Sequence, residues 1–353
     1  METPASKPTP PPTLTRWYID TRLLTSTTST LPLLSTLQQT EQTTVQKFYH
    51  LKDKHMSLAS NLLKYLFIHR ICRVPWSSIV ISRTPDPHRR PCFIPPLTSE
   101  KKKKKNEEGE WGEAEDAVTT TRVEFNVSHQ ASMVAIVGTT IPSNGNDKGA
   151  PEVGVDITCV NERRNRSGPE GGRSLASLHK YIDIFTEVFS AGEMEDMRRL
   201  HGASSTTGTS ESRLVDYGYR LFYTYWALKE AYIKMTGEAL LAPWLRELEF
   251  SNVVAPEAED GGGRFGEPYR GVRTKLYNEL VEDVRVEVVA LEGDYLIATA
   301  ARGEGVGAAA LRARNGNRDG DGGDGVDPWM PFKMMDIERD IRPCAMGLCS
   351  CLS

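Results

Sequence analysis

Strand-like and helical patterns follow one another irregularly along this chain, in two comparable halves, residues 14–140 and 150–301. The regular β-α-β alternation that builds a doubly wound parallel sheet is missing. The glycine-rich phosphate loops of the P-loop and dinucleotide-binding types are also missing. We therefore expect an α+β fold with an N-terminal lobe, residues 14–140, and a C-terminal lobe, residues 150–301. Apolar periodicity predicts helices at about 54–71, 180–200 and 212–236.

Two segments lack the patterns of regular structure. Residues 100–118 contain five consecutive lysines, Lys101 to Lys105, followed by a run of acids, so we expect a solvated low-complexity insert there. Residues 315–325 are rich in glycine and aspartate but lack the ligand spacing of a calcium loop, so we expect a linker. We expect residues 302–353 as a whole to form a flexible tail.

Composition limits the classes of function. The net charge of the 353 residues is −4, which does not suit a protein that coats nucleic acid, so an anion site must be local. The six cysteines have neither the spacing of a disulfide framework nor that of a zinc site, although the three in the tail could carry acyl chains. With no apolar run of signal-peptide or membrane-spanning type, we expect a soluble, cytoplasmic protein.

The predicted helix at 212–236 carries a polar group beside an aromatic ring. Trp226, Glu230 and Lys234 are four residues apart and therefore lie along one face. A carboxylate and an ammonium beside a large ring can form a site. They can equally be an ordinary surface ion pair next to a core tryptophan.

One acid interrupts an otherwise apolar strand pattern. Asp156 lies within Val153–Val160, and a carboxylate in a buried strand is unfavourable unless it is paired, hydrogen-bonded or bound to a metal. Gly154 would let a ligand or another backbone approach closely. The pattern leaves a structural role and a ligand role for Asp156 equally open.

Ser128 and His129 follow a predicted strand. Neighbouring side chains in a strand point to opposite faces, so the pair does not suit a nucleophile with its base. Both groups can bind a phosphate, and a turn-capping role is the alternative. Further basic side chains, suited to phosphate recognition or simply to the surface, are Lys52, Arg83, Arg89 and Arg90.

In combination these segments resemble one enzyme family. The chain is similar to the phosphopantetheinyl transferases of the surfactin-synthetase-activating type, particularly the fungal members, over about residues 15–301. That family has a Gly-x-Asp strand followed by a Trp-x-x-Lys-Glu-x-x-x-Lys helix, after a Phe-Asn-x-Ser-His segment. The matching residues are Gly154-Val-Asp156, Trp226 to Lys234 and Phe125-Asn-Val-Ser-His129, with Trp17-Tyr-Ile-Asp20 and Arg83 to Pro91 as flanking matches.

The resemblance implies two similar lobes related by a pseudo-twofold axis, with coenzyme A in the cleft between them. Asp156 and Glu230 would bind Mg²⁺, and Lys234 would lie near the pyrophosphate. Ser128 and His129 would hold the 3′-phosphate end of coenzyme A. Lys52, Arg83, Arg89 and Arg90 would supply further nucleotide and phosphate contacts. Two positions depart from the bacterial pattern: Thr158 replaces a second acid, where we expect it to hold a water on the ion, and Met56 replaces a basic residue.

The implied reaction moves the 4′-phosphopantetheine arm of coenzyme A onto a serine of an apo-carrier protein. Glu230 would activate the serine and Lys234 would stabilise the departing 3′,5′-ADP. Carriers of fatty-acid, polyketide, nonribosomal-peptide and aminoadipate-reductase systems are all possible partners, and we expect a monomer that binds neither nucleic acid nor membrane. The alternatives are a non-catalytic coenzyme A or nucleotide-binding protein and, through Lys101–Lys105, a nucleic-acid-binding protein.

Overall fold

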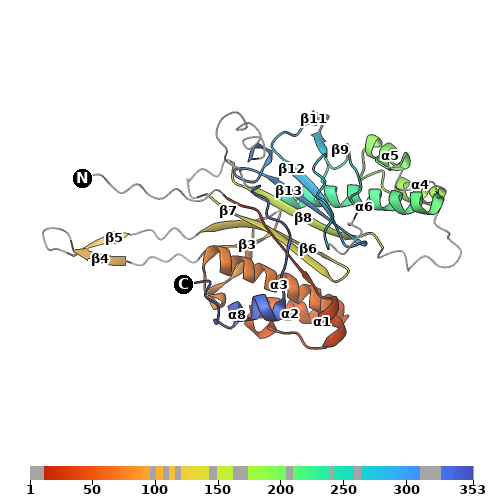
Figure 1. The fold of residues 1–353 in the computed structure, drawn as a ribbon. Coiled ribbons are helices and arrows are strands. Elements are labelled where there is room, and N and C mark those ends of the chain that lie inside the picture. Colours follow the sequence, from red (N-terminus) through yellow and green to blue (C-terminus); the bar gives the residue numbers. More distant parts are fainter. Residues whose placement is uncertain are drawn as a thin grey trace, which may run out of the picture.

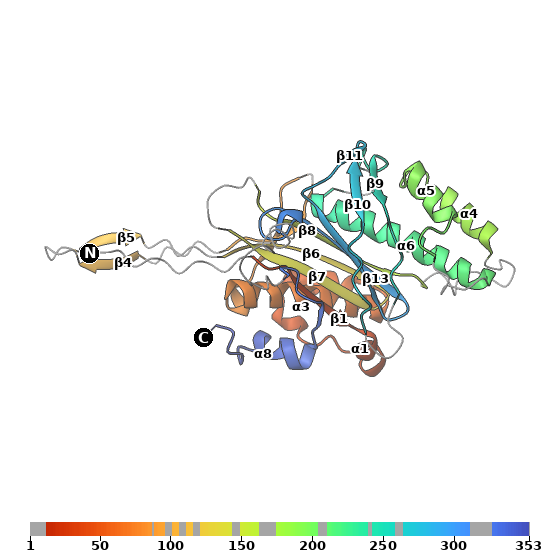
Figure 2. The ribbon, with the colours of Figure 1, turned by 45° about the horizontal axis from the view of Figure 1, so that its top comes forward.

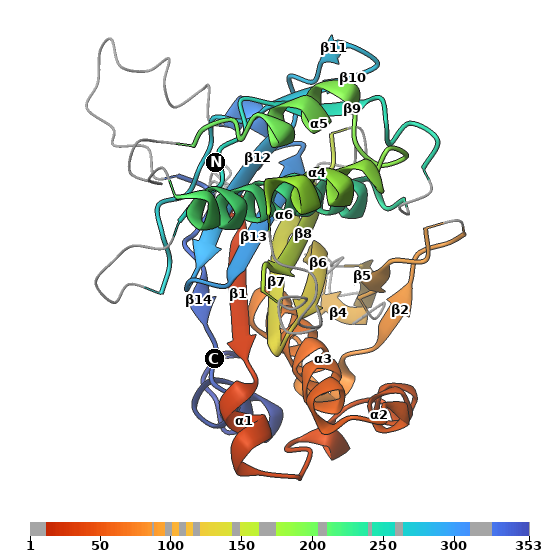
Figure 3. The ribbon, with the colours of Figure 1, turned by 90° about the vertical axis from the view of Figure 1, so that its right-hand side faces the viewer.

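The described parts of the chain form four layers: helix, sheet, sheet, helix (Figure 1). The two sheets lie face to face, with helix α3 (Leu51–Cys72) outside one and helix α6 (Glu211–Thr236) outside the other (Figure 3). The computed structural model describes residues 12–86, 88–95, 101–105, 111–115, 121–142, 149–161, 174–203, 210–238, 242–257, 264–310 and 327–352.

The first sheet has the strand order β14-β1-β7-β6. All its pairs are antiparallel except the short parallel edge that β14 adds to β1. Helix α3 covers its outer face with a stripe of buried leucines that includes Leu58, Leu62 and Leu66. The strands are β1 (Thr15–Asp20), β6 (Arg122–Gln130), β7 (Met133–Ile141) and β14 (Lys333–Met334). Around them lie α1 (Arg22–Thr27), η1 (Leu34–Thr36), α2 (Gln39–Lys47), η2 (Trp76–Ser78), β2 (Ile81–Arg83) and β3 (Pro91–Phe93).

The second sheet is antiparallel, in the order β12-β13-β8. Helix α6 packs on its outer face, where Leu221, Tyr225 and Leu228 are buried. The strands are β8 (Glu152–Cys159), β12 (Arg285–Leu291) and β13 (Tyr295–Arg302). The remaining elements of this half are α4 (Leu175–Asp183), α5 (Ala191–Arg198), β9 (Leu248–Ser251), β10 (Arg273–Leu276) and β11 (Glu279–Leu280).

A third apolar core holds the two sheets together. It combines side chains of β1 and β7, such as Tyr18 and Val137, with side chains of β8 and β13, such as Val155 and Ile297. The expected mixture of helices and strands is therefore present, and the sheets are mainly antiparallel. Among the described helices, none has the length and apolar composition that a membrane span requires.

Three expectations about local structure need correction. The helical pattern at about 180–200 is two helices, because Ser190 starts α5 with a capping box: its hydroxyl accepts from the Glu193 N–H and Glu193 accepts from the Ser190 N–H. Within the low-complexity insert, the backbone forms a two-stranded antiparallel ribbon, β4 (Lys101–Lys105) with β5 (Trp111–Glu115), where a loop was expected.

The tail, expected to be flexible, is folded over residues 327–352. Strand β14 pairs with β1, and Trp329 is buried against the sheet core. A π-helical turn (Ile337–Ile341) and helix α8 (Arg342–Ala345) then pack beside α3 (Figure 2). The apolar side chains that anchor these short elements are too few and too irregularly spaced to form a periodic pattern in the sequence. The predicted linker at 315–325 lies outside the described residues.

Candidate active site

Polar side chains of β6 connect the two sheets edge to edge. The side-chain oxygens of three alternate residues of β6 accept hydrogen bonds from backbone N–H groups of β8. In an ordinary sheet, backbone carbonyls of the neighbouring strand would accept these bonds. The pairs are Asn126 Oδ1 with Val155 at 3.1 Å, Ser128 Oγ with Ile157 at 3.3 Å, and Gln130 Oε1 with Cys159 at 2.9 Å. The Phe-Asn-x-Ser-His segment therefore has a structural role besides any ligand contact, because it fixes β6 against β8.

Gly154 allows α6 to lie directly on β8. A Cβ atom at this position would lie 2.1 Å from the Ala231 carbonyl oxygen and 2.4 Å from the Met235 nitrogen. The close approach predicted for Gly154 is therefore that of a helix backbone. It brings Glu230 and Lys234 of α6 over Asp156, two residues further along β8.

Asp156 is the centre of a polar cluster at this junction. Lys234 Nζ lies 2.6 Å from Asp156 Oδ1 and 2.9 Å from Ser128 Oγ. The hydroxyls of Ser128 and Thr158 donate to Asp156 at 3.0 Å and 2.6 Å. The sequence left a structural role and a ligand role open for Asp156. The structure shows a buried carboxylate that is paired with an ammonium and accepts hydrogen bonds from two hydroxyls. Thr158, expected to hold a water, bonds directly to the carboxylate.

Glu230 is the second carboxylate of the cluster. Its Oε2 lies 3.9 Å from Lys234 Nζ. Burial raises the pKa of Glu230, the Lys234 ammonium lowers it, and the negative charge of Asp156 raises it again. Two partly buried carboxylates thus face one ammonium group. Their charges and their oxygen ligands fit a hard divalent cation such as Mg²⁺, which binds through one or two carboxylates.

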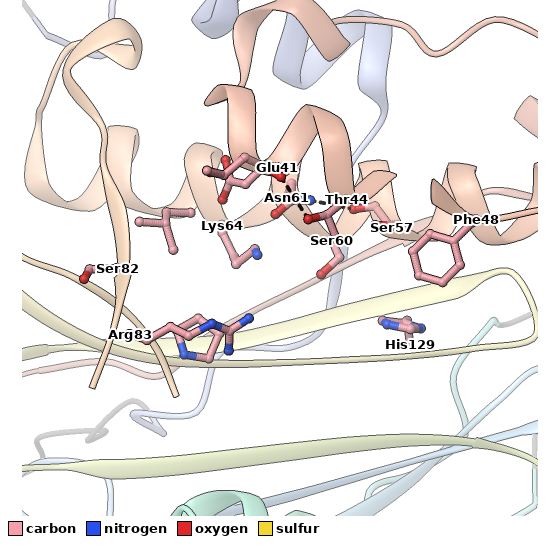
Figure 4. A pocket seen from close by; sticks show the side chains of 13 residues that line it. Glu41, Thr44, Phe48, Ser57, Ser60, Asn61, Lys64, Ser82, Arg83 and His129 are labelled. Carbon is pink, nitrogen blue, oxygen red and sulfur yellow. Dashed lines mark hydrogen bonds between the residues drawn. The ribbon is translucent and has the colours of Figure 1, made fainter. Parts of the chain in front are cut away.

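A cavity of about 420 Å³ opens on the other side of β6, between α2, α3 and the β2–β3 hairpin (Figure 4). Three basic side chains line it: Lys64 from α3, Arg83 from β2 and His129 from β6. Burial lowers the pKa of Lys64 to about 8, although the Glu41 carboxylate opposes this shift. Partial loss of solvent lowers the pKa of His129, and the ammonium groups of Lys234 and Lys64 lower it further. Such a cavity attracts an anion, because an anion relieves the repulsion between its cations.

Ser128 and His129 do not act on the same side of β6. Ser128 contacts Asp156 and Lys234, whereas His129 lines the cavity with α3. The expectation that both hold the 3′-phosphate therefore fits His129 better than Ser128. Because Ser128 and His129 are consecutive residues of β6, the carboxylate cluster and the cavity are neighbours on opposite sides of this strand.

The structure separates the other basic residues. Arg83 lines the cavity, but Arg90 does not: its guanidinium donates to Glu124, to the Met235 carbonyl at 3.2 Å and to the Val153 carbonyl at 3.1 Å. These contacts tie the β2–β3 segment to β6, β8 and α6. Arg89 is exposed and lies 3.8 Å from Asp86, and Lys52 is exposed on the first turn of α3, outside the cavity lining.

Met56, where a basic residue was noted as absent, is buried below the β6–β7 turn. Its sulfur accepts from the Ser132 N–H at 3.1 Å. The position therefore supports the turn that follows His129 and supplies no charge to the cavity.

Sequence reasoning missed Lys64 as a cavity residue. The signal was present, because Ser57, Ser60, Asn61 and Lys64 form a polar stripe at helical spacing in the middle of a helix whose other residues there are mainly apolar. The first lysine of the Trp-x-x-Lys-Glu segment, Lys229, has a different role: it is fully buried and lies 2.9 Å from the buried Glu193 carboxylate.

Comparisons with known proteins agree with this arrangement. Residues 25–141 match the family "4′-phosphopantetheinyl transferase, N-terminal", and residues 152–299 match the "4′-phosphopantetheinyl transferase superfamily". The 4′-phosphopantetheinyl transferase NpgA of Emericella nidulans is 67% identical over 97% of each chain. The 4′-phosphopantetheinyl transferase A of Aspergillus fumigatus is 53% identical over 96% of each chain, and a 4′-phosphopantetheinyl transferase of Aureobasidium melanogenum is 35% identical over 82% of this chain. The resemblance of the motifs is thereby confirmed, and the chain belongs to the 4′-phosphopantetheinyl transferase superfamily.

Proposed function

We propose that this protein transfers the 4′-phosphopantetheine arm of coenzyme A to a serine of apo-carrier proteins. The observation that carries the proposal is the convergence of Asp156, Glu230 and Lys234 next to a basic cavity. One part of this arrangement suits the nucleotide end of coenzyme A, and the other suits the pyrophosphate that is cleaved.

The 3′-phosphate end of coenzyme A occupies the basic cavity in this proposal. Lys64 and Arg83 supply the positive charge, and His129 adds a hydrogen-bond donor. The pyrophosphate then extends past the end of β6 toward Lys234. Ser128 contributes by orienting Asp156 and Lys234, to which it is hydrogen-bonded.

Asp156 and Glu230 would hold Mg²⁺. When bound, the ion would offset the negative charge of the pyrophosphate oxygens. That charge otherwise repels the attacking serine oxygen. Two carboxylates lie 2.6 Å and 3.9 Å from the single Lys234 ammonium, so the cluster keeps an excess of negative charge that favours a cation. The Thr158 and Ser128 hydroxyls hold the Asp156 carboxylate in place from two sides.

In the transfer step the serine oxygen of the carrier forms a bond to the β-phosphorus. The bond between that phosphorus and the bridging oxygen breaks, and 3′,5′-ADP leaves with the electron pair. Glu230, next to Lys234 and Asp156, accepts the proton of the serine hydroxyl. The Lys234 ammonium stabilises the charge that develops on the departing phosphate.

The two halves share one topology, which supports a pseudo-twofold relation between them. Each half has three main strands. The strand that comes first in the chain pairs with the strand that comes last, and the last strand also pairs with the middle one, which gives the orders β1-β7-β6 and β8-β13-β12. Each half also places one long helix, α3 or α6, between its first and middle strands. A second contact between the sheets joins β1 to β12, where Arg16 Nη1 lies 2.5 Å from Glu287 Oε1. We further propose that the protein acts in the cytoplasm as a monomer, because one chain supplies both halves.

The test is incubation with coenzyme A, Mg²⁺ and a panel of apo-carriers from fatty-acid, polyketide, nonribosomal-peptide and aminoadipate-reductase systems. A mass increase of one phosphopantetheine arm on at least one carrier supports the proposal. Coenzyme A binding by the folded protein without transfer to any carrier would instead identify a non-catalytic binding protein.

A further inference from the structure

Four potential metal ligands converge where the folded tail meets α3. His69 lies near the end of α3, and Cys344, Cys349 and Cys351 belong to the tail. Their ligand atoms all lie within 4.8 Å of one another. His69 Nε2 lies 3.1 Å from Cys349 Sγ, and the Sγ atoms of Cys344 and Cys351 are 3.7 Å apart.

We propose that His69, Cys344, Cys349 and Cys351 bind one structural zinc ion. With Zn–S bonds of about 2.3 Å and Zn–N bonds of about 2.0 Å, tetrahedral ligand atoms lie roughly 3.5–3.8 Å apart. The Cys344–Cys351 separation of 3.7 Å falls in that range, and no pair of ligand atoms is more than 4.8 Å apart, so side-chain adjustments of about 1 Å bring all four atoms into position. One histidine with three cysteines is a typical donor set of a closed structural zinc site, and three soft thiolates disfavour Mg²⁺.

The backbone orients His69 as a ligand. His69 Nδ1 lies 2.8 Å from the Val74 carbonyl oxygen. A carbonyl only accepts, so Nδ1 carries the proton and the neutral ring directs the lone pair of Nε2 at the cysteines. Arg73 makes this contact possible, because its left-handed conformation (φ 53°) ends α3 and turns Val74 back toward the helix. A histidine that binds zinc through one nitrogen and donates to a carbonyl through the other is the usual arrangement.

A neighbouring cation balances the charge. Three thiolates and one Zn²⁺ ion carry a net charge of −1. Arg70 lies beside the cluster: its Nη2 atom is 3.9 Å from Cys344 Sγ and donates to the Asp340 carbonyl at 2.8 Å. The same guanidinium thus contacts the cluster and the π-helical turn that precedes it.

The site explains how the tail stays folded. Residues 335–351 contribute few buried apolar side chains of their own, among them Met335, Ile337 and Ile341. A zinc ion would add three bonds from the tail to one bond from α3, and such ions supply folding energy directly. Because α3 also carries Lys64, the ion would stabilise the wall of the basic cavity.

The test is the metal content of the full-length protein, purified without chelators or metal-affinity steps and measured by mass spectrometry. We expect one zinc ion per chain, lost from Cys349→Ser and Cys351→Ser, whose side chains are only partly buried, and retained in Cys92→Ser, a partly buried cysteine outside the cluster. Cobalt(II) added to the apo-protein should give the visible absorption of a tetrahedral thiolate site, and Cys351→Ser should weaken it.

Three results would overturn the proposal. They are a folded wild-type protein that neither contains zinc nor takes up zinc or cobalt(II), zinc retained by both serine variants, and a Cys344–Cys351 disulfide found by mass spectrometry in protein purified under reducing conditions. Folding of each variant is checked by circular dichroism, and the three cysteines provide independent variants if one of them fails to fold.

Discussion

Lys234 Nζ lies 2.6 Å from Asp156 Oδ1, which joins the last turn of α6 to the middle of β8. The contact depends on Gly154, because any side chain there would collide with the backbone of α6. A single close approach of helix and strand therefore brings the basic and acidic groups of the active site together.

We expect Glu230→Gln to reduce transfer by about 100-fold or more, the usual size of a general-base contribution. Asp156→Asn should have a similar effect, because it removes half the negative charge that faces Lys234. Both changes keep side-chain volume, so the melting temperature should change little. Transfer to an apo-carrier is followed by mass spectrometry, with Glu187→Gln, an exposed glutamate 3.7 Å from Arg246, as the control. A Glu230→Gln variant with wild-type turnover would exclude Glu230 as the base.

Thr158 tests how closely Asp156 is positioned. Its buried hydroxyl donates to Asp156 Oδ2 at 2.6 Å. Thr158→Val keeps the shape but removes that bond, which costs about 1 kcal/mol, or roughly a fivefold loss in kcat/KM if the bond matters in the transition state. Thr158→Ser keeps the donor and should stay near wild type. Equal activity of the valine and serine variants would show that the hydroxyl does not position Asp156.

The sequence predicted the Asp156, Glu230 and Lys234 cluster better than the cavity. Asp156 lies in one strand, and Glu230 and Lys234 lie in one long helix, so periodicity alone gives their faces once the two elements are recognised. Arg83 and Arg90 are seven residues apart in a turn segment, and only tertiary contacts decide that Arg83 lines the cavity while Arg90 binds Glu124 and two carbonyls.

The tail shows a second limit of sequence reasoning. Its strand β14 has two residues and its π-helical turn has five, too short for apolar periodicity to appear. Their positions depend on contacts with β1 and α3, some 270 to 310 residues away in the chain. Likewise, the sequence spacing of Cys344, Cys349 and Cys351 does not indicate a metal site. The fourth candidate ligand, His69, belongs to α3 and comes close to them only in the folded chain.

Lys64 should give the reaction a pH dependence in the alkaline range. Its pKa is about 8 in the free protein, because burial disfavours the ammonium form. Above that pH the side chain becomes neutral and attracts the 3′-phosphate less, so kcat/KM for coenzyme A should fall as pH rises through about 8. Lys64→Arg keeps its charge at all these pH values and should lack this limb. An unchanged limb in Lys64→Arg would assign it to another group.

Recognition of the 3′-phosphate can be measured with dephospho-coenzyme A. We expect this analogue to have a higher KM than coenzyme A, because it leaves Lys64, Arg83 and His129 without their anion. The difference should shrink in His129→Ala and in Lys64→Met, but not in Arg89→Ala, whose side chain is exposed beside Asp86. A difference that persists in both cavity variants would place the 3′-phosphate outside this cavity.

Substitution by methionine should affect the two lysines of the Trp226–Lys234 segment differently: at Lys229 it should lower stability, and at Lys234 it should lower transfer activity. Lys229 is fully buried, lies 2.9 Å from the buried Glu193 carboxylate and donates to the Leu245 carbonyl at 3.1 Å. Lys229→Met leaves Glu193 charged and without its cation, which should lower the free energy of unfolding by about 3–5 kcal/mol. Lys234 is partly exposed, so Lys234→Met should cost little stability but remove the charge that stabilises 3′,5′-ADP as it departs. Chemical denaturation and transfer rates, measured on both variants, separate the two effects. A stable Lys229→Met variant, or an active Lys234→Met variant, would contradict the role assigned to that lysine.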